Sequence, residues 1–201
     1  MSSDHLRECA PVDLSDEDVM AAMKAMMGYI DITPGDFRDV YQVAYALARQ
    51  RMMTALKAAD VMTTPVHAIN ADADLIAVAG LLAEHGISGA PVTDGDGRII
   101  GVVSEKDFLS GMGAGRSGAF MQVVAHCLKS KECVAAPMAG RTAGDIMTAP
   151  AITAPPNISI ADVSALLMGN TINRLPIADP DGRPAGIVTR SDLVNAFCML
   201  G

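Results

Sequence analysis

The chain has 201 residues and a formal net charge of −8; half of its residues are apolar and only 3% are aromatic. This length allows one compact domain or two small ones that share a core, and that core must be built from aliphatic side chains and an unusual 14 methionines. An acidic chain without a basic stripe on its repeated segments argues against a nucleic-acid partner and against an anionic membrane surface.

The N-terminal segment, residues 1–58, is predicted to be helical after a loose start over residues 1–12. Ser15 precedes an acidic first turn, which is typical of a helix N-cap, so a short helix should run from there to Met27 and end at Gly28. The polar beginning of the chain also predicts that no secretory signal peptide is present.

A second, longer helix is predicted to begin with Thr33 as its cap and Pro34 at its first position. Apolar residues then recur at helical spacing from Phe37 onward, which predicts an amphipathic helix to about Ala58. We interpret its apolar stripe as a packing surface that either covers the rest of the chain or pairs with a second subunit.

Two later segments repeat one pattern in a constant register of 85 residues, as from Asp60 to Asp145. The matched residues are 60–65 with 145–150, Pro91 with Pro176, Gly97 with Gly182, Gly101 with Gly186, and Ser104–Asp107 with Thr189–Asp192. A register without a gap predicts one folding unit that has been duplicated.

Each copy is predicted to have the order β-α-β-β-α. The expected elements of the first copy are strand 66–69, helix 74–85, strands 90–93 and 99–103 around a tight turn at 94–97, and a helix from Ser104. Those of the second are strand 151–153, helix 159–168, strands 175–178 and 185–188, and a helix from Thr189. One copy alone buries too little surface to be stable, so the two should pack sheet to sheet.

The linker between the copies, residues 111–143, is longer than an ordinary connection and predicts a helix from Ala119 to Lys129. Its basic residues are Arg116, Lys129, Lys131 and Arg141, against one acid, Glu132. A solvated loop and a lid that reaches toward an anion both remain open. Residues 113–118 match G-x-G-x-x-G, but they follow a helix rather than a strand, so we interpret them as flexible linker.

The four cysteines, Cys9, Cys127, Cys133 and Cys198, are scattered and fit no zinc-binding spacing. We therefore predict reduced thiols in a cytoplasmic protein and no metal site. A site at His126, Cys127 and Cys133 is the alternative, with a spacing that matches no known motif. The apolar stretches, such as residues 75–83, are too short to span a bilayer.

These motifs resemble those of tandem CBS domains, a family named for cystathionine β-synthase. The family pattern has an Asp-Val-Met-like opening, an apolar-Pro-apolar strand, and Gly-h-h-Ser/Thr-x-x-Asp, with h apolar, before the last helix; here the last motif is residues 101–107 and 186–192. The resemblance covers residues 59–110 and 144–199. Residues 14–58 resemble the helical leader of some bacterial stand-alone CBS proteins.

The resemblance implies an α+β fold, in which two β-α-β-β-α CBS repeats pack with pseudo-two-fold symmetry as a Bateman module and leave two clefts between them. The expected domain bounds are 1–58 for the helical segment, 59–110 for repeat 1, 111–143 for the linker and 144–201 for repeat 2. Such modules commonly bind adenosine compounds: AMP, ADP, ATP, or in some proteins S-adenosylmethionine, NAD or dinucleotides.

The resemblance therefore implies a regulatory module that binds an adenosine nucleotide without an obligatory cofactor, forms a homodimer and signals to a protein effector. The alternative is a structural or dimerisation module whose clefts are empty. The sequence contains no recognisable nucleophile–base constellation, so we do not expect an enzyme.

Asp107 and Asp192 are the candidates to hold a ribose, because a carboxylate can accept hydrogen bonds from both ribose hydroxyls. Ser104 and Thr189 precede them by three residues, a spacing that is also that of a helix-capping box; its duplication in register favours binding. The resemblance implies that Arg174 is a phosphate ligand, because related modules often place a basic residue at this position; the first repeat has Gly89 there.

The remaining candidates are expected around the adenine, although plain core packing is an equal alternative for most of them. They are Thr63, Pro65, Ser88, Ala90, Thr148, Pro150 and Asn173. Further positive charge is available from Lys106, His85 and Arg190.

Overall fold

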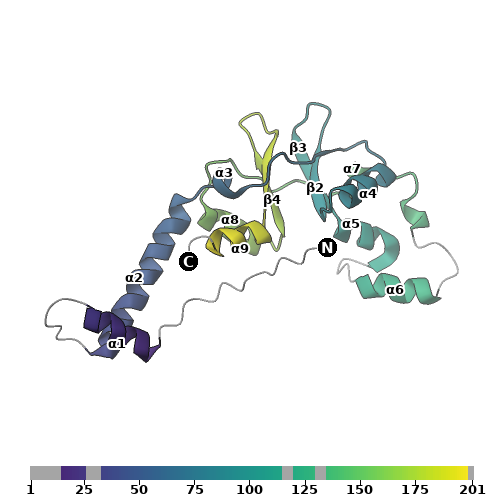
Figure 1. The fold of residues 1–201 in the computed structure, drawn as a ribbon. Helices are drawn as coiled ribbons and strands as arrows, with labels where there is room; N and C mark the ends of the chain where they lie inside the picture. The colour runs from purple at the N-terminus through teal and green to yellow at the C-terminus, as the bar shows by residue number, and fades with distance from the viewer. Residues whose placement is uncertain (1–14, 26–32, 115–119, 130–134, 199–201) are drawn as a thin grey trace.

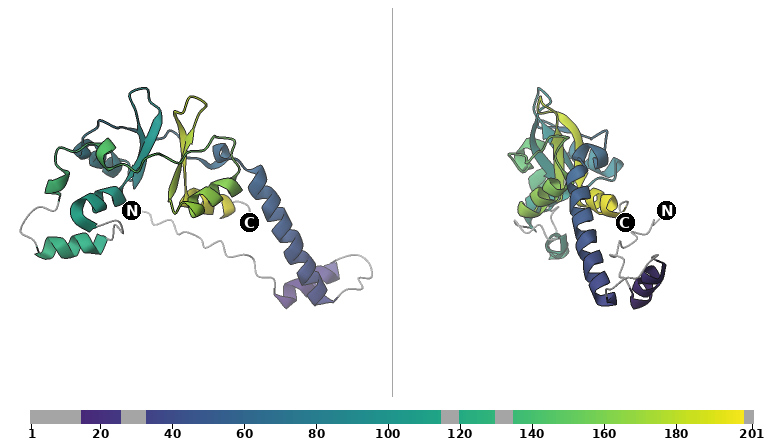
Figure 2. Two further views of the ribbon diagram at one scale, coloured as in Figure 1. Left: turned by 180° about the vertical axis from the view of Figure 1, so that it is seen from behind. Right: turned by 90° about the vertical axis from the view of Figure 1, so that its left-hand side faces the viewer.

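The computed structural model describes residues 15–25, 33–114, 120–129 and 135–198 (Figure 1). In these ranges, two similar halves lie side by side, and a helical arm extends away from them (Figures 1 and 2). No helix in the described ranges is both long enough and apolar enough to cross a membrane.

The arm consists of α1 (Asp16–Ala25) and α2 (Pro34–Ala55), which pack against each other. Both predicted helix starts are confirmed. At the second, the Thr33 hydroxyl donates a hydrogen bond to Asp36 Oδ2 (2.7 Å), and the Asp36 N–H donates to Thr33 Oγ1 (3.2 Å). The predicted end of the first helix at Met27 and Gly28 lies outside the described residues.

Helix α2 ends at Ala55, before the predicted Ala58, because the following residues pair with the second repeat. The Ala58 N–H donates to the Ile158 carbonyl (2.9 Å), and the Ile160 N–H donates to the Leu56 carbonyl (3.0 Å). A separate short helix, α3 (Ala58–Val61), begins at this junction. The chain thus turns where tertiary pairing replaces the helical hydrogen bonds.

The first half contains β1 (Ile69–Asn70), α4 (Leu75–Glu84), β2 (Gly89–Thr93), β3 (Ile99–Ser104) and α5 (Glu105–Leu109), which continues as a π-helical segment over Ser110–Ala114. Its sheet has the order β1-β2-β3, with β1 parallel to β2 and β3 antiparallel. The second half contains α8 (Ile160–Gly169), β4 (Arg174–Ala178), β5 (Pro184–Thr189) and α9 (Arg190–Cys198), with β4 and β5 antiparallel.

The predicted bounds of the first strand are wrong in both repeats. In the first half the strand is Ile69–Asn70, later than predicted; in the second half only a single bridge, at Ala154, joins β4. The difference between the halves has a simple cause. The Ala71 N–H extends the first ladder by donating to the Thr93 carbonyl (2.9 Å), whereas the matching residue of the second repeat is Pro156, which has no N–H.

The linker contains the predicted helix as α6 (Phe120–Lys129), followed by a 3₁₀ turn (Ala136–Met138) and α7 (Ala143–Ile146). Arg141 donates to the Asp145 carbonyl oxygen (2.8 Å) and does not reach toward an anion site. Arg116, Lys131 and Glu132, together with most of the glycine-rich run, lie outside the described residues, so the lid interpretation stays a prediction.

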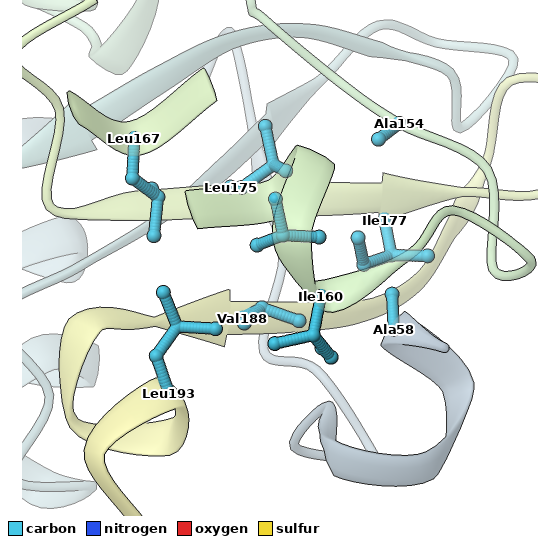
Figure 3. Close-up of a cluster of buried hydrophobic side chains, with 9 residues drawn as sticks. Ala58, Ala154, Ile160, Leu167, Leu175, Ile177, Val188 and Leu193 are labelled. Atoms are coloured by element: carbon cyan, nitrogen blue, oxygen red, sulfur yellow. The ribbon is translucent and has the colours of Figure 1, made fainter. Parts of the chain in front are cut away.

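The core has two parts, one in each half, and both are built almost wholly from aliphatic side chains. Figure 3 shows the second part, in which α8, α9, β4, β5 and α3 contribute Ile160, Leu167, Leu193, Leu175, Ile177, Val188 and Ala58. Ala58 precedes the first repeat's strands in sequence yet lies in the second half's core. In the same way, Ala143 of α7 lies in the first half's core. The two copies are therefore interlaced.

The segments that follow α3 and α7 complete this exchange. Thr63 pairs with Ile187 of β5, and Thr148 pairs with Val102 of β3, in each case through two backbone hydrogen bonds of 2.9–3.2 Å. Glycines permit the approach: a Cβ at Gly186 would overlap the side chain of Met62, and a Cβ at Gly101 would overlap that of Met147. The opening of each copy thus lies against the other half.

The ends of α4 and α8 differ by one residue that carries backbone strain. Gly86 follows α4 with φ of 60°, a left-handed conformation that glycine adopts freely. The matching residue after α8 is Thr171, with φ of 55°, and a β-branched side chain is unfavourable there.

We expect Thr171→Gly to raise the free energy of unfolding by about 1 kcal/mol, because it removes the strain of a β-branched residue in the left-handed region. The reciprocal variant, Gly86→Thr, should lower it by a similar amount. Urea unfolding of both variants, without added ligand, measures the two changes. A loss of stability in Thr171→Gly would contradict the strain assigned to this turn.

Candidate ligand-binding clefts

Two clefts lie between the halves. Cleft 1, of about 410 Å³, is lined by Ser88, Val102, Ser104, Glu105, Lys106, Asp107, Thr148, Pro150, Ala151, Ile152, Thr171, Ile172, Asn173 and Arg174. Cleft 2, of about 250 Å³, is lined by Thr63, Pro65, Val66, His67, Gly86, Ile87, Ser88, Gly89, Pro91, Arg174, Ile187, Thr189 and Asp192. Cleft 1 falls within the usual size of small-molecule sites, and cleft 2 lies just below it.

Each cleft combines the acid of one repeat with the opening segment of the other. Asp107 of the first repeat shares cleft 1 with residues 148–152, and Asp192 of the second shares cleft 2 with residues 63–67. The interlacing produces this arrangement, because the chain after α3 runs along β5 and the chain after α7 runs along β3. A ligand in either cleft would therefore contact both halves.

Both acids are held by capping interactions at the starts of their helices. Asp107 Oδ2 accepts hydrogen bonds from the Ser104 N–H (2.7 Å) and hydroxyl (2.6 Å). Asp192 Oδ2 accepts the same pair from Thr189, both at 2.7 Å. The capping interpretation of these motifs is thus correct, but it uses only one oxygen of each carboxylate.

The other oxygens are available to the clefts. Among the described residues, Asp107 Oδ1 accepts only a long hydrogen bond, of 3.3 Å, from the Thr148 hydroxyl of the opposite repeat. Within the described part of the chain, no group donates to Asp192 Oδ1. Capping therefore orients each carboxylate and leaves its second oxygen to accept from a ligand.

Arg174 lies between the clefts and lines both. Its Nη2 donates to the Ser88 hydroxyl (2.7 Å), while its Nη1 is buried and has no hydrogen-bond partner among the described residues. Burial lowers the pKa of Arg174, and the negative charges of Glu105 and Asp107 oppose that shift. The guanidinium stays charged at neutral pH, because an arginine side chain does not deprotonate in proteins.

Most of the predicted site residues line a cleft. Ser88, Ser104, Asp107, Thr148, Pro150, Asn173 and Arg174 line cleft 1, and Thr63, Pro65, Ser88, Arg174, Thr189 and Asp192 line cleft 2. Ala90 differs from the expectation: it is 1% exposed, belongs to the first half's core and lines neither cleft. It lies within β2, where it pairs with Val103 of β3.

The structure adds features of the clefts that the motifs did not single out. Glu105 lies beside Asp107 in cleft 1, at an unspecified position of the Ser-x-x-Asp motif. In cleft 2, the His67 ring stacks on His85 with centroids 3.7 Å apart and planes at 16°. The matching residues of the second repeat are Ile152 and Asn170, so the duplication carries no signal for this pair. Lys106 lines cleft 1, whereas Arg190 lines neither.

Within the described ranges, no three His, Cys, Asp or Glu side chains gather to form a metal site. The proposed alternative ligands at His126, Cys127 and Cys133, and the other cysteines, fall among residues whose side chains are not described.

The model of the CBS domain family matches residues 58–113 and 143–198, more than half of the chain. The chain is 32% identical over 161 residues to the uncharacterized protein MJ1426 of Methanocaldococcus jannaschii, covering 69% of this chain and 89% of that protein. It is 31% identical over 123 residues to the chloroplastic CBS domain-containing protein CBSX2 of Arabidopsis thaliana, but spans only 52% of that protein's length and 58% of its own.

Two solved structures share the fold. The crystal structure of CBSX2 in complex with AMP has a TM-score of 0.57 and 26% identity, covering 72% of this chain and 97% of that one. The CBS domain of a CBS domain-containing membrane protein from Sphaerobacter thermophilus has a TM-score of 0.59 and 31% identity, covering 78% and 97%. The interlaced repeats, the paired clefts and these matches establish that the chain belongs to the CBS domain family and carries two CBS domains.

Proposed function

We propose that this chain is a regulatory module that binds an adenosine nucleotide between its two CBS domains and signals through a change in conformation or assembly. AMP, ADP and ATP are the ligands that its clefts suit best. The chain acts on a protein effector, forms a homodimer and catalyses no reaction itself.

The observation that carries this proposal is that each cleft pairs one oriented carboxylate with the guanidinium of Arg174, which both clefts share. Asp107 or Asp192 can accept both hydroxyls of a ribose, since each has one oxygen outside its capping interaction. Arg174 offers a guanidinium whose Nη1 lacks a partner among the described residues, and phosphate oxygens suit such a donor. An adenosine nucleotide supplies the diol and the phosphate together.

The related CBSX2 protein supports the same ligand class, because its crystal structure contains AMP. Cleft 1 is the better candidate for the first molecule bound, because it is larger and has Lys106 in addition to Arg174. Its apolar lining, Ile152 and Pro150, suits the faces of a purine.

Each cleft is lined by residues of both halves, and this arrangement can couple ligand binding to a change in conformation. A ligand that contacts residues of both halves binds more tightly to the geometry that brings those residues together, and so shifts the population toward it. An effector or a second subunit that contacts the module would respond to that shift.

A thermal-shift screen with AMP, ADP, ATP, NAD and S-adenosylmethionine tests the proposal. A ligand present at about 100 times its dissociation constant should add roughly 2.7 kcal/mol to the free energy of unfolding. The double variant Asp107→Ala/Asp192→Ala is the control and should lose about half of this gain or more. If no adenosine compound stabilises the protein, the structural module with empty clefts is the function that remains.

A further inference from the structure

Two side chains, Ser88 and Arg174, line both clefts, and they are joined by the hydrogen bond from Arg174 Nη2 to Ser88 Oγ (2.7 Å). Every other lining residue in the described part of the chain belongs to one cleft. The boundary between the clefts is therefore a single arginine held by a single serine.

The pseudo-two-fold symmetry of the module would place a second cation at residue 89, but that position is glycine. A Cβ at Gly89 would overlap the Arg174 guanidinium and the Val103 carbonyl oxygen. The guanidinium thus occupies the space that a side chain at position 89 would need. The site has room for one arginine, and the two clefts have to share it.

The two clefts differ in the other charged residues that could bind a phosphate in place of Arg174. Cleft 1 is lined by Lys106, Glu105 and Asp107, and both acids attract the Arg174 guanidinium. Cleft 2 has Asp192 and His67. A phosphate in cleft 2 would therefore depend more heavily on Arg174 than a phosphate in cleft 1.

We propose that Arg174 makes the two clefts compete for phosphate-bearing ligands, so that the first nucleotide bound weakens the binding of the second. A guanidinium that forms a bidentate contact with one phosphate cannot form the same contact with a second phosphate. The second phosphate would also meet the charge of the first across a short, partly buried distance. A nucleoside without a phosphate needs no cation and binds each cleft independently. This inference rests on the proposed function.

The test compares AMP with adenosine by titration calorimetry on the full chain and on Asp107→Ala and Asp192→Ala, which each retain one intact cleft. We call Asp107→Ala and Asp192→Ala the single-cleft variants. In the unaltered chain, we expect the dissociation constant of the second AMP to be about 5- to 150-fold higher than the dissociation constant of AMP in the weaker-binding of these two variants. Adenosine should show no such difference. Arg174→Gln keeps a donor for Ser88 but removes the charge, and it should reduce the AMP coupling to the part that repulsion between the two phosphates contributes.

Each outcome decides the inference. If the unaltered chain binds one AMP while both single-cleft variants still bind AMP, the competition is strong and the inference is supported. Two AMP sites that match the single-cleft variants would overturn it while leaving the proposed function intact. If AMP binds to only one of the two single-cleft variants, the inference is also overturned, because a single functional cleft has no second cleft to compete with. If neither AMP nor adenosine binds, the proposed function itself fails, and the inference fails with it.

Discussion

Replacing Asp107 or Asp192 with alanine is expected to weaken the binding of an adenosine nucleotide to the corresponding cleft by tenfold to a hundredfold or more. The carboxylate would lose charge-assisted hydrogen bonds to the ribose hydroxyls, which contribute about 1.5–3 kcal/mol each. This change should exceed that of any substitution on the exposed surface. Titration calorimetry measures the affinity directly, and an unchanged dissociation constant in both variants would refute the ribose assignment.

The same substitutions also remove a helix cap, so a matched control is needed. Asp145 provides it: Asp145 Oδ2 accepts from the Thr142 N–H (2.8 Å) and hydroxyl (3.0 Å), the same arrangement as at Asp192, but the residue lines neither cleft. These hydrogen bonds lower the pKa of Asp145. Asp145→Ala should lower the free energy of unfolding, because a capping interaction is lost, and leave ligand affinity unchanged.

A drop in affinity for Asp145→Ala as large as that for Asp192→Ala would assign the effect to lost capping. Among the described residues, Asp36, Asp107, Asp145, Asp162 and Asp192 each accept a hydrogen bond from the hydroxyl of the residue three positions earlier. The comparison of Asp145 with Asp192 therefore separates the effect of capping from the effect of lining a cleft.

Leu175→Ala is expected to lower the free energy of unfolding by about 2–5 kcal/mol, the range measured when a buried leucine is truncated. Leu175 is fully buried in β4, among side chains from α8, α9 and β5 (Figure 3). Few aromatic residues are available to fill the resulting cavity, because only 3% of the chain is aromatic. Urea unfolding measures the loss, and Ile76→Ala, at an 86% exposed position, should change it by no more than about 0.5 kcal/mol.

The interlacing of the two copies predicts that the loss of stability in Leu175→Ala affects both halves. Because α3 carries Ala58 into the second half's core and α7 carries Ala143 into the first half's core, neither half can unfold without exposing part of the other. We expect amide exchange in β2 and β3 to accelerate along with exchange in β4 and β5. Unchanged protection of β2 and β3 in Leu175→Ala would show that the halves unfold separately.

Local features of the fold could be read from the sequence because their causes are local. The capping residues Thr33 and Asp36 satisfy backbone groups within one turn, and α2 begins where they predict. The hairpin turns, at Gly97 and Gly182 with φ of 80°, recur because glycine tolerates that conformation. The domain bounds stay a prediction, but the repeat itself is visible since duplicated structure needs duplicated residues.

Features that depend on residues distant in the sequence are predicted wrongly from the sequence or are not predicted at all. The sequence predicts the first strands too early, and their different lengths depend on whether an N–H is available opposite Thr93 or Ala178. The sequence predicts Ala90 beside the ligand, whereas strand pairing and burial place it in the core. The stacked His67 and His85 come from separate elements, and no spacing in the sequence indicates that their rings meet.

By itself, the sequence determined that one unit occurs twice, which residues cap its helices, and which two carboxylates recur in register. Only the tertiary structure decided that each acid faces the opening segment of the other repeat, and that a single arginine lies over Gly89 between the clefts. The physical reason is that local hydrogen bonds and turn conformations are encoded within a few residues. The exchange of α3 and α7 between cores, and the space left by a missing side chain, exist only once the two copies have packed together.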